Sequence, residues 1–468
     1  MVGHGSLSGL RMAIENAAQC DPDRVALTDG HETRTYGELA RLAEVTDVHG
    51  EIGREVLVVG GSLRDVELIL GKAFEGVSLL LLDSKSTAAE VERAEAIFVE
   101  GSGEGLDGVV LGLCTSGSSG LPKVVELDWE GVIYNAGAFG DAARYGEGDV
   151  VWCTTPLAHL YCLGAGVIGG LLHGATILLT LGMLDPEEFS RMATEQAPTF
   201  LLSIPFLFRR YLMMLIGEPG LAESWSVRSC IAAGEAVAPD LIAAWRKASG
   251  VSLLSHYGLT EGGQITLASG DGDDGVGRPL AGVEVQLRSD GAVRVRRPGA
   301  AAHRIIGRPA DPEGWCETGD LGYLDEDGNL HITGRADRRI NVAGKKVDPA
   351  EVEQVLASCE GVEDCAVARI EGSEGEQVVA FVQADGAAAA DGAIRAQLAA
   401  RLSPHKLPRR FVRVEEIPRT LTGKVRLGNL IADLESADAA DAAEARESSV
   451  ADSTLGRRLE GLPDGERD

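Results

Sequence analysis

The chain has 468 residues, more than one hydrophobic core usually supports, so we expect a large domain together with at least one smaller one. Its 43 Lys and Arg against 72 Asp and Glu give a formal net charge of -29, which argues against nucleic acid and against an anionic membrane surface as partners. No apolar run approaches the roughly 18 residues of a membrane-spanning helix, and the first ten residues do not resemble a secretory signal, so we expect a soluble cytoplasmic protein.

Short apolar runs alternate with helix-like segments through the first two thirds of the chain. Residues 55–59 and 79–82 are expected to be strands, with a helix at 62–72 between them. Further on, buried strands are expected at 150–154, 175–180 and 199–204, and a helix at 240–249. The alternation predicts an α/β fold, with a large N-terminal domain of several subdomains, mixed sheets and helices over residues 1–335.

The pattern changes after Arg335 to a compact alternating unit. It predicts, in order, a helix at 349–358, strands at 366–370 and 377–383, a helix at 391–401 and a strand at 411–414. We therefore expect a small, mobile α+β domain over residues 336–432. Residues 433–468 contain eleven acidic residues and four arginines, with few large apolar residues after Leu434, which predicts an acidic disordered tail.

The eight cysteines are scattered along the chain, with no Cys-x-x-Cys pair and no grouping with histidine. Isolated thiols of this kind are typical of core residues in a reducing compartment. We expect them to be structural, and we expect no zinc site.

The most informative segment is LGLCTSGSSGLPKVV at residues 111–125, where an apolar strand leads into a loop of small and hydroxyl residues. Backbone N–H groups can approach phosphate oxygens closely in such a loop, and a lysine adds positive charge. The segment does not fit the Walker A pattern. Taken alone it is also compatible with a flexible connection. The candidate phosphate-binding residues are Thr115, Ser116, Gly117, Ser118, Ser119, Gly120 and Lys123.

Six further segments follow in a fixed order. They are Gly234-Glu235-Ala236, His256-Tyr257-Gly258-Leu259-Thr260-Glu261 with Val276-Gly277-Arg278-Pro279 after it, Thr318-Gly319-Asp320-Leu321, Gly334-Arg335-Ala336-Asp337, and Pro418-Arg419-Thr420-Leu421-Thr422-Gly423-Lys424. In these motifs and their order, across about 310 residues, the chain resembles the adenylate-forming (AMP-binding) superfamily of acyl- and aryl-CoA synthetases and stand-alone adenylation enzymes.

The resemblance implies a role for each nucleotide-binding position. Tyr257 and Gly258 would lie against the adenine, opposite a wall made by Gly234, Glu235 and Ala236. Thr260 would bind phosphate and Glu261 would hold Mg²⁺, a metal that needs few protein carboxylates because it keeps water and phosphate ligands. Asp320, assisted by Arg335, would accept hydrogen bonds from the ribose hydroxyls, since a vicinal diol suits a carboxylate. Without a nucleotide-binding role, Glu261 would be a solvated loop acid and Asp320 an ordinary turn residue.

The small domain carries the residues implied for two half-reactions. Lys424 would bridge the attacking carboxylate and the α-phosphate, because a mobile ammonium can neutralise charge where two anions meet. Asp337 matches the family's hinge, about which the domain would rotate. After rotation the loop 341–346 would face the site, with Gly344 and Lys345 lining the tunnel for the thiol.

The acid is expected to bind near the segment Pro156 to Gly164. His159 and Tyr161 fall where related CoA ligases place a pocket aromatic and a gate, and His159 is also a candidate catalytic residue. No Asp occurs from Trp152 to Gly170 to pair with a substrate ammonium, so an aryl or acyl acid without an α-amino group is favoured. The remaining candidate pocket residues are Ser203, Pro205, Phe206, Gly258, Gly262 and Gly263.

The chain departs from the family in three places. Val124 stands after Lys123 where the family usually has glycine, the region before Thr115 is short, and no carrier-protein domain follows Lys424. The thiol acceptor is therefore expected to be CoA or the phosphopantetheine of a separate carrier protein. The expected cofactors are ATP and Mg²⁺. The oligomeric state is left open, a homodimer being compatible with the sequence.

Two other functions stay open at this point. An adenylate-forming enzyme could use an amine acceptor or activate an inorganic acid such as nitrite. From another class, the chain could be a nucleotide-binding protein without catalytic activity, although Glu261, Asp320, Arg335 and Lys424 together argue against that reading.

Overall fold

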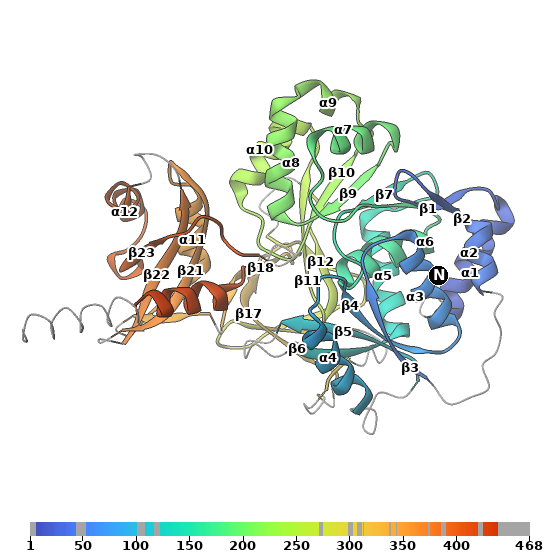
Figure 1. Ribbon diagram of the computed structural model, residues 1–468, viewed down its shortest axis with the longest axis horizontal. Helices are drawn as coiled ribbons and strands as arrows, with labels where there is room; N and C mark the ends of the chain where they lie inside the picture. The colour runs from blue at the N-terminus through green and yellow to red at the C-terminus, as the bar shows by residue number, and fades with distance from the viewer. Residues whose placement is uncertain are drawn as a thin grey trace, which may run out of the picture. The chain divides into compact units, whose positions relative to one another are not determined.

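The computed structural model describes residues 6–43, 53–100, 108–116, 122–270, 275–297, 303–306, 311, 313–336, 338–342, 344–372, 375–384, 390–419 and 425–438. These residues form two compact units, a larger one up to residue 336 and a smaller one from Arg338 onward. The bar in Figure 1 identifies the smaller unit by its orange to red colours.

A nine-stranded sheet is the centre of the larger unit. Its order is β13-β12-β11-β10-β9-β7-β8-β1-β2, and β8, β7, β9, β10 and β11 run parallel to one another. The strands are β1 (Val25–Thr28), β2 (Thr33–Thr35), β7 (Val150–Cys153), β8 (Thr176–Leu179), β9 (Phe200–Ser203), β10 (Ser229–Ala232), β11 (Leu253–Leu259), β12 (Gly263–Leu267) and β13 (Arg278–Pro279). The runs of β7 to β10 are almost wholly apolar because helices cover both faces of these parallel strands.

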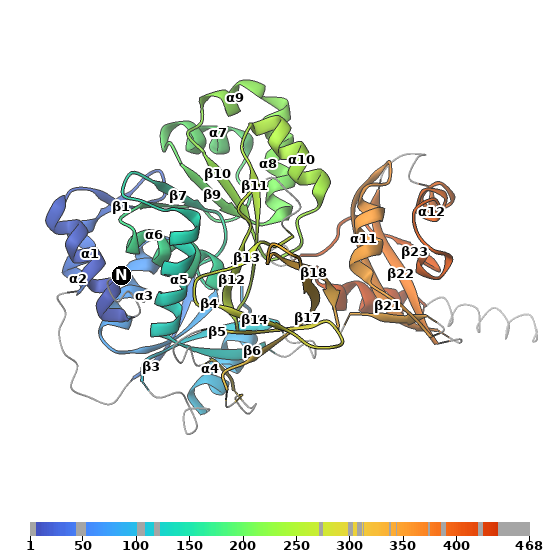
Figure 2. The same cartoon turned by 180° about the vertical axis from the view of Figure 1, so that it is seen from behind.

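Alternate residues of the parallel strands point to opposite faces of the sheet and pack into two separate hydrophobic cores. In β7, Val151 and Cys153 belong to one core and Trp152 to the other. The first core is completed by α1 (Leu7–Cys20), α2 (Tyr36–Ala43), α3 (Leu63–Phe74), α5 (Trp129–Ala143), the π-helix η2 (Tyr161–Ile168) and α6 (Gly169–Leu172). The second is completed by α7 (Pro186–Glu195), α8 (Pro205–Gly217), α9 (Pro219–Ser224) and α10 (Pro239–Ser249), which Figures 1 and 2 show gathered on one side.

Local signals set several helix boundaries. Ser62 and Asp65 form a reciprocal capping box at the start of α3. Asp185 caps α7 and proline follows it, while Gly250 ends α10 with a φ of 72°.

Two further sheets complete the larger unit. One has the order β16-β6-β5-β4-β3 and the other β14-β15-β17-β18, and α4 packs against the former. Their elements are β3 (Arg54–Val59), β4 (Ser78–Asp83), α4 (Ala88–Glu100), β5 (Val110–Ser116), β6 (Pro122–Asp128), β14 (Glu284–Leu287), β15 (Ala292–Arg296), β16 (His303–Ile305), β17 (Cys316–Leu324) and β18 (Leu330–Arg335).

The smaller unit packs helices on both faces of a three-stranded sheet. Val367 and Ala380 face one core, while Ala366 and Val379 face the other. Its elements are β19 (Ile340–Val342), β20 (Lys345–Val347), α11 (Pro349–Ala357), β21 (Val362–Gly372), β22 (Gly375–Ala384), α12 (Asp391–Ala399), the 3₁₀ turn η4 (Pro404–Lys406) and β23 (Arg410–Arg413). Residues 427–438 are helical, so the first six residues of the predicted tail lie in a helix.

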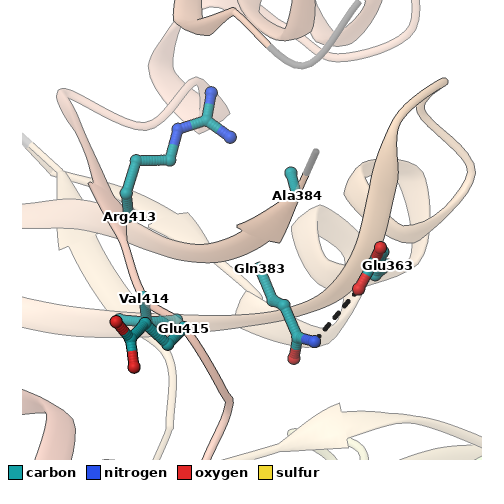
Figure 3. A pocket seen from close by; sticks show the side chains of 6 residues that line it. All are labelled: Glu363, Gln383, Ala384, Arg413, Val414 and Glu415. Carbon is teal, nitrogen blue, oxygen red and sulfur yellow. Dashed lines mark hydrogen bonds between the residues drawn. The ribbon is translucent and has the colours of Figure 1, made fainter. Parts of the chain in front are cut away.

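A recess lies at one end of this small sheet, beside the start of β21 and the ends of β22 and β23. Figure 3 shows the Gln383 side chain next to Glu363, to which its amide donates a hydrogen bond of 3.1 Å. Its lining is Glu363, Gln383, Ala384, Arg413, Val414 and Glu415.

This architecture confirms the predicted fold class, a large α/β part with mixed sheets followed by a small α+β part. The predicted helices and strands are all present. The π-helix η2 was not expected from the sequence. None of the helices among the described residues combines the length and apolar character needed to cross a lipid bilayer.

Candidate nucleotide and acid site

Four adjacent parallel strands bring their carboxyl ends to one edge of the large sheet. They are β7, β9, β10 and β11. The segments that leave them carry His159 after β7, Ser203 to Phe206 after β9, Gly234 to Ala236 after β10, and Tyr257 to Glu261 at the end of β11. Open α/β sheets bind ligands outside this edge, so strand order gathers candidates that are far apart in sequence.

Tyr257, Asp320 and Arg335 form a polar cluster. The Tyr257 hydroxyl donates to Asp320 Oδ2 at 2.5 Å, and Arg335 Nη1 lies 3.5 Å from Asp320 Oδ1. Burial, and then the adjacent Asp320 carboxylate, raise the pKa of Tyr257, so the phenol stays a hydrogen-bond donor.

The backbone around Asp320 is fixed by its own motif. Thr318 Oγ1 donates to the carbonyl oxygen of Val293 at 2.7 Å and accepts from the Asp320 N–H at 3.0 Å. Gly319 has a φ of 77°, and a β-carbon there would lie 2.9 Å from Arg335. The positive φ therefore favours glycine between Thr318 and Asp320.

The candidate phosphate loop joins the antiparallel strands β5 and β6. Thr115 lies opposite Lys123, so both side chains project from the same face of the hairpin. Gly117, Ser118, Ser119 and Gly120 lie outside the described residues, as does the side chain of Ser116.

Thr260 and Glu261 lie in the turn between β11 and β12, and both side chains are partly exposed. Gly263 ends the turn with a φ of 71°, and a β-carbon there would lie 2.6 Å from Asn135 Oδ1. The described residues contain no group of three His, Cys, Asp or Glu side chains suited to a metal. A single carboxylate beside a hydroxyl fits Mg²⁺, which is bound largely through water and substrate phosphates.

An amide pair that sequence reasoning missed fixes this turn. Asn135 on α5 accepts from the Gln264 N–H at 2.6 Å and donates to the Gln264 carbonyl at 2.7 Å. Gln264 Nε2 in turn donates to the carbonyl oxygen of Leu160 at 2.9 Å. Gln264 could have been noticed three residues after Glu261, whereas nothing in the sequence marks Asn135.

Rings fill the opposite side of β11. His256 stacks on Tyr161 with ring centres 5.4 Å apart and meets Phe139 edge-on at 5.0 Å. The His256 Nδ1 lies 2.6 Å from the Thr266 carbonyl oxygen and Nε2 lies 2.5 Å from Gln264 Oε1. Burial lowers the pKa of His256, although both hydrogen bonds favour the protonated ring.

The other predicted pocket residues lie at the same edge. Ser203 is fully buried and shares a 2.7 Å hydrogen bond with the Thr154 hydroxyl. Pro205 and Phe206 open α8, and Phe206 is partly exposed. His159 precedes η2 and is partly exposed, while Gly258 leaves no space for a β-carbon, which would lie 2.7 Å from the Gly263 carbonyl oxygen. A β-carbon at Gly262 would lie 3.0 Å from the side chains of Leu259 and Val295, a less severe contact.

The adenine-wall residues follow β10 directly. Gly234 has a φ of 92°, and the preceding Ala233 N–H donates to the Ser203 carbonyl oxygen at 3.2 Å. This turn lets Glu235 and Ala236 leave the sheet at the edge that carries Tyr257.

The candidates of the small domain are described only in part. Lys424 and Asp337 lie outside the described residues. Gly344, with a φ of 83°, and Lys345 are exposed residues at the turn of the β19–β20 hairpin, in the smaller unit.

Two family models match the chain. One, described as AMP-binding enzyme, covers residues 71–302, and the other, described as AMP-binding enzyme C-terminal domain, covers residues 351–424.

Curated relatives resemble the chain over most of its length. The 2-succinylbenzoate–CoA ligase of Geobacillus kaustophilus is 27% identical over 88% of this chain and 95% of its own. The 3-hydroxybenzoate–CoA ligase of an Aromatoleum species is 28% identical over 67% of this chain, and the match spans 64% of that relative. Among solved structures, the anthranilate CoA ligase AuaEII in complex with anthranoyl-AMP superposes with a TM-score of 0.77 at 19% identity, over 92% of this chain and 98% of that one.

Proposed function

Because the chain belongs to the AMP-binding enzyme family, we propose that it activates a carboxylic acid with ATP to give an acyl-adenylate and pyrophosphate, then transfers the acyl group to a thiol. The observation that carries the proposal is the polar cluster of Tyr257, Asp320 and Arg335, which three separate motifs build at the edge of the sheet. A carboxylate held there by a phenol and a guanidinium is suited to a ribose diol beside an aromatic ring.

We propose the following roles in the adenylation step. Tyr257 and the turn Gly234 to Ala236 hold the adenine, and Asp320 holds the ribose. Thr115 and Lys123 on the β5–β6 hairpin, together with Thr260, contact the phosphates, while Glu261 would hold Mg²⁺, which offsets phosphate charge. The acid enters beside Tyr161 and Gly258, so that its carboxylate oxygen attacks the α-phosphorus and pyrophosphate leaves.

Lys424 is the group we assign to charge neutralisation during this attack. A lysine ammonium between carboxylate and α-phosphate favours the transition state, in which two anions approach. In the second half-reaction a thiolate attacks the acyl carbon and AMP leaves. The relatives point to CoA as the acceptor, with a carrier protein's phosphopantetheine as the chemically equivalent alternative.

Acid-dependent exchange of labelled pyrophosphate into ATP tests the first half-reaction. We expect exchange with at least one member of a panel of aliphatic and aromatic acids, and mass spectrometry should detect the CoA thioester once CoA is added. If a folded protein that still binds ATP showed no pyrophosphate exchange with any acid, the alternative of a nucleotide-binding protein without catalytic activity would be favoured. Asp320→Ala should abolish exchange, whereas Asp327→Ala, an exposed turn acid, should leave it unchanged.

A further inference from the structure

Helix α8 presents large apolar side chains to solvent. Met213 is 65% exposed and Ile216 is 56% exposed. They lie on the same face, because residues three apart are neighbours on the surface of a helix. The opposite face supplies Phe208, Tyr211 and Leu215 to the second hydrophobic core. The described residues of the chain therefore leave Met213 and Ile216 uncovered.

Two exposed arginines precede these apolar side chains by about one turn of α8. They are Arg209 and Arg210. The Arg210 guanidinium lies over the Phe206 ring, 5.8 Å from its centre. Phe206 is a partly exposed candidate pocket residue, so this face begins one turn from the predicted acid site. We call the exposed face of Arg209, Arg210, Met213 and Ile216 the α8 surface.

The composition of the α8 surface is that of a protein interface with an acidic partner. Arginine and methionine are enriched in such interfaces, whereas lysine and acidic residues are depleted. Helix α8 contains no lysine and no acidic residue, in a chain with 72 Asp and Glu. Guanidinium groups beside an apolar centre are complementary to carboxylates beside an apolar centre. An anionic membrane is a poorer partner, because the net charge of -29 opposes its approach.

The neighbouring helix α10 adds positive charge on this side of the larger unit. Figures 1 and 2 show the two helices side by side, and the Trp245 ring of α10 meets a phenylalanine ring of α8 edge-on, with ring centres 4.8 Å apart. Arg246 and Lys247 in the last turn of α10 are both exposed. Exposed acids lie at the ends of the pair, Glu218 after α8 and Asp240 in the first turn of α10.

Resting on the function proposed above, we propose that the α8 surface docks an acidic carrier protein, which delivers the acceptor thiol on its phosphopantetheine arm. The carrier's thiolate attacks the acyl carbon, the C–S bond forms, and AMP leaves with the electron pair of the broken C–O bond, while the thiol proton passes to solvent. Free CoA needs no such surface. One helix face is small for a protein interface, which suits a carrier that must leave after each turnover.

The test compares thiol acceptors by kcat/KM for thioester formation with an acid that the wild type activates. The acceptors are a panel of holo acyl, aryl and peptidyl carrier proteins, CoA, and pantetheine. We expect at least one carrier to exceed pantetheine by about tenfold or more, because docking adds binding energy. Arg209→Glu combined with Arg210→Glu should lower kcat/KM for that carrier by about 30-fold or more, and for CoA and pantetheine by less than about twofold.

Three controls separate docking from a general change of charge. Arg64→Glu combined with Arg93→Glu makes the same charge change at exposed arginines of α3 and α4, and should leave use of the carrier unchanged. Met213→Ser changes no charge and should lower carrier use by about tenfold, because an exposed apolar contact is lost. Raising salt from about 0.05 to 0.3 M should weaken carrier use but not pantetheine use, since salt screens exposed charges.

Four outcomes would overturn the inference. No carrier exceeds pantetheine, or the two charge-reversal pairs lower carrier use equally. The α8 pair lowers CoA use as much as carrier use, which would assign the surface to the CoA phosphates. The α8 pair abolishes sedimentation with phosphatidylserine vesicles while carrier use is unchanged, which would assign it to a membrane. Failure of the proposed function is distinct, because no acid would then support pyrophosphate exchange, which the α8 variants should retain.

Discussion

A single hydrogen bond, from Tyr257 to Asp320, joins two sequence motifs that lie 63 residues apart. The resemblance predicted that each residue would contact a different part of the nucleotide, but it did not predict that they would contact each other. With Arg335 on the other carboxylate oxygen, Asp320 is held in one orientation before any ligand binds. A preorganised acceptor of this kind loses little freedom on binding ribose.

Removing the Tyr257 hydroxyl should weaken nucleotide binding. A hydrogen bond to a charged group contributes about 1.5–3 kcal/mol, so we expect Tyr257→Phe to raise KM for ATP by about tenfold or more while kcat changes less. Steady-state kinetics with ATP varied at saturating acid measures this. Tyr323→Phe, at an exposed tyrosine, is the control and should leave KM unchanged. An unaltered KM in Tyr257→Phe would mean that the bond does not orient Asp320.

Arg297 is a buried cation that sequence reasoning did not single out. Among the described residues its Nη1 and Nη2 atoms have no hydrogen-bond partner, and burial lowers the pKa of its guanidinium. Asp128 offsets part of the charge without a direct bond, and its own pKa is raised by burial. An incompletely paired buried charge generally destabilises a fold.

Replacing Arg297 together with Asp128 should therefore stabilise the protein, because removing Arg297 alone would leave the buried Asp128 carboxylate without its counter-charge. We expect Arg297→Met combined with Asp128→Asn, which keeps an N-cap residue for α5, to raise the free energy of unfolding by about 1–2 kcal/mol, measured by denaturant titration. The neighbouring Arg296 pairs with Glu284 at the surface, and Arg296→Met should change stability by less than about 1 kcal/mol. A marked loss of stability in the double variant would show that the two charges are satisfied within the fold.

At the scale of secondary-structure elements, α5 and η2 support the candidate site, although α5 carries none of the sequence motifs and η2 carries only the candidate Tyr161 and the residues that follow it. Asn135 of α5 holds both backbone groups of Gln264, next to the turn that carries Glu261. Tyr161, the first residue of η2, bonds to β10 and stacks on β11. π-Helical turns often occur at functional sites, because the wider turn shifts side chains out of regular register.

Breaking the contact between α5 and β12 should affect both folding and catalysis. Asn135→Ala leaves the Gln264 N–H and carbonyl unpaired, so we expect a loss of about 2–3 kcal/mol in unfolding free energy. We also expect a drop of about tenfold in kcat, because Glu261 shifts with its turn. Asn329→Ala removes another buried amide, bonded to Asp325 at 2.9 Å, and should reduce stability alone. If Asn135→Ala and Asn329→Ala had the same kcat, Asn135 would have no specific role in positioning Glu261.

For the whole molecule, the candidate site residues are divided between two units. The larger unit contains the polar cluster of Tyr257, Asp320 and Arg335 and the packed rings of His256, Tyr161 and Phe139, while Gly344 and Lys345 belong to the smaller one. In the rotation that the family resemblance implies, each half-reaction would use a different face of the smaller unit. The half-reactions should then be separable by mutation.

Lys424→Ala should abolish adenylation yet largely spare thioester formation from a supplied acyl-adenylate. Loss of a preorganised positive charge lowers such rates by about 100-fold or more. Pyrophosphate exchange reports the first half-reaction, and CoA-dependent consumption of synthetic acyl-adenylate reports the second. Lys247→Ala, an exposed lysine on α10, should leave both unchanged. Equal loss of both half-reactions in Lys424→Ala would contradict the rotating-domain account.

The sequence by itself determined the fold class, the family and the positions of those helices and strands that it predicted. Those features depend on local sequence patterns, such as the apolar run of β9 and the capping residues of α3, or on contiguous motifs such as 256–261. The cysteines likewise lie where their scatter predicted: all eight are free, and six are buried.

Only the tertiary structure decided which residues meet. Asn135 and Gln264 are 129 residues apart, and Tyr161 reaches the backbone of β10 70 residues away. These contacts depend on the order of strands in the sheet and on which face each side chain takes. No local pattern encodes either, because strand order results from packing the whole core. The polar cluster around Asp320, the packing of Tyr161 and Phe139 on His256 and the buried Arg297 are consequences of that packing.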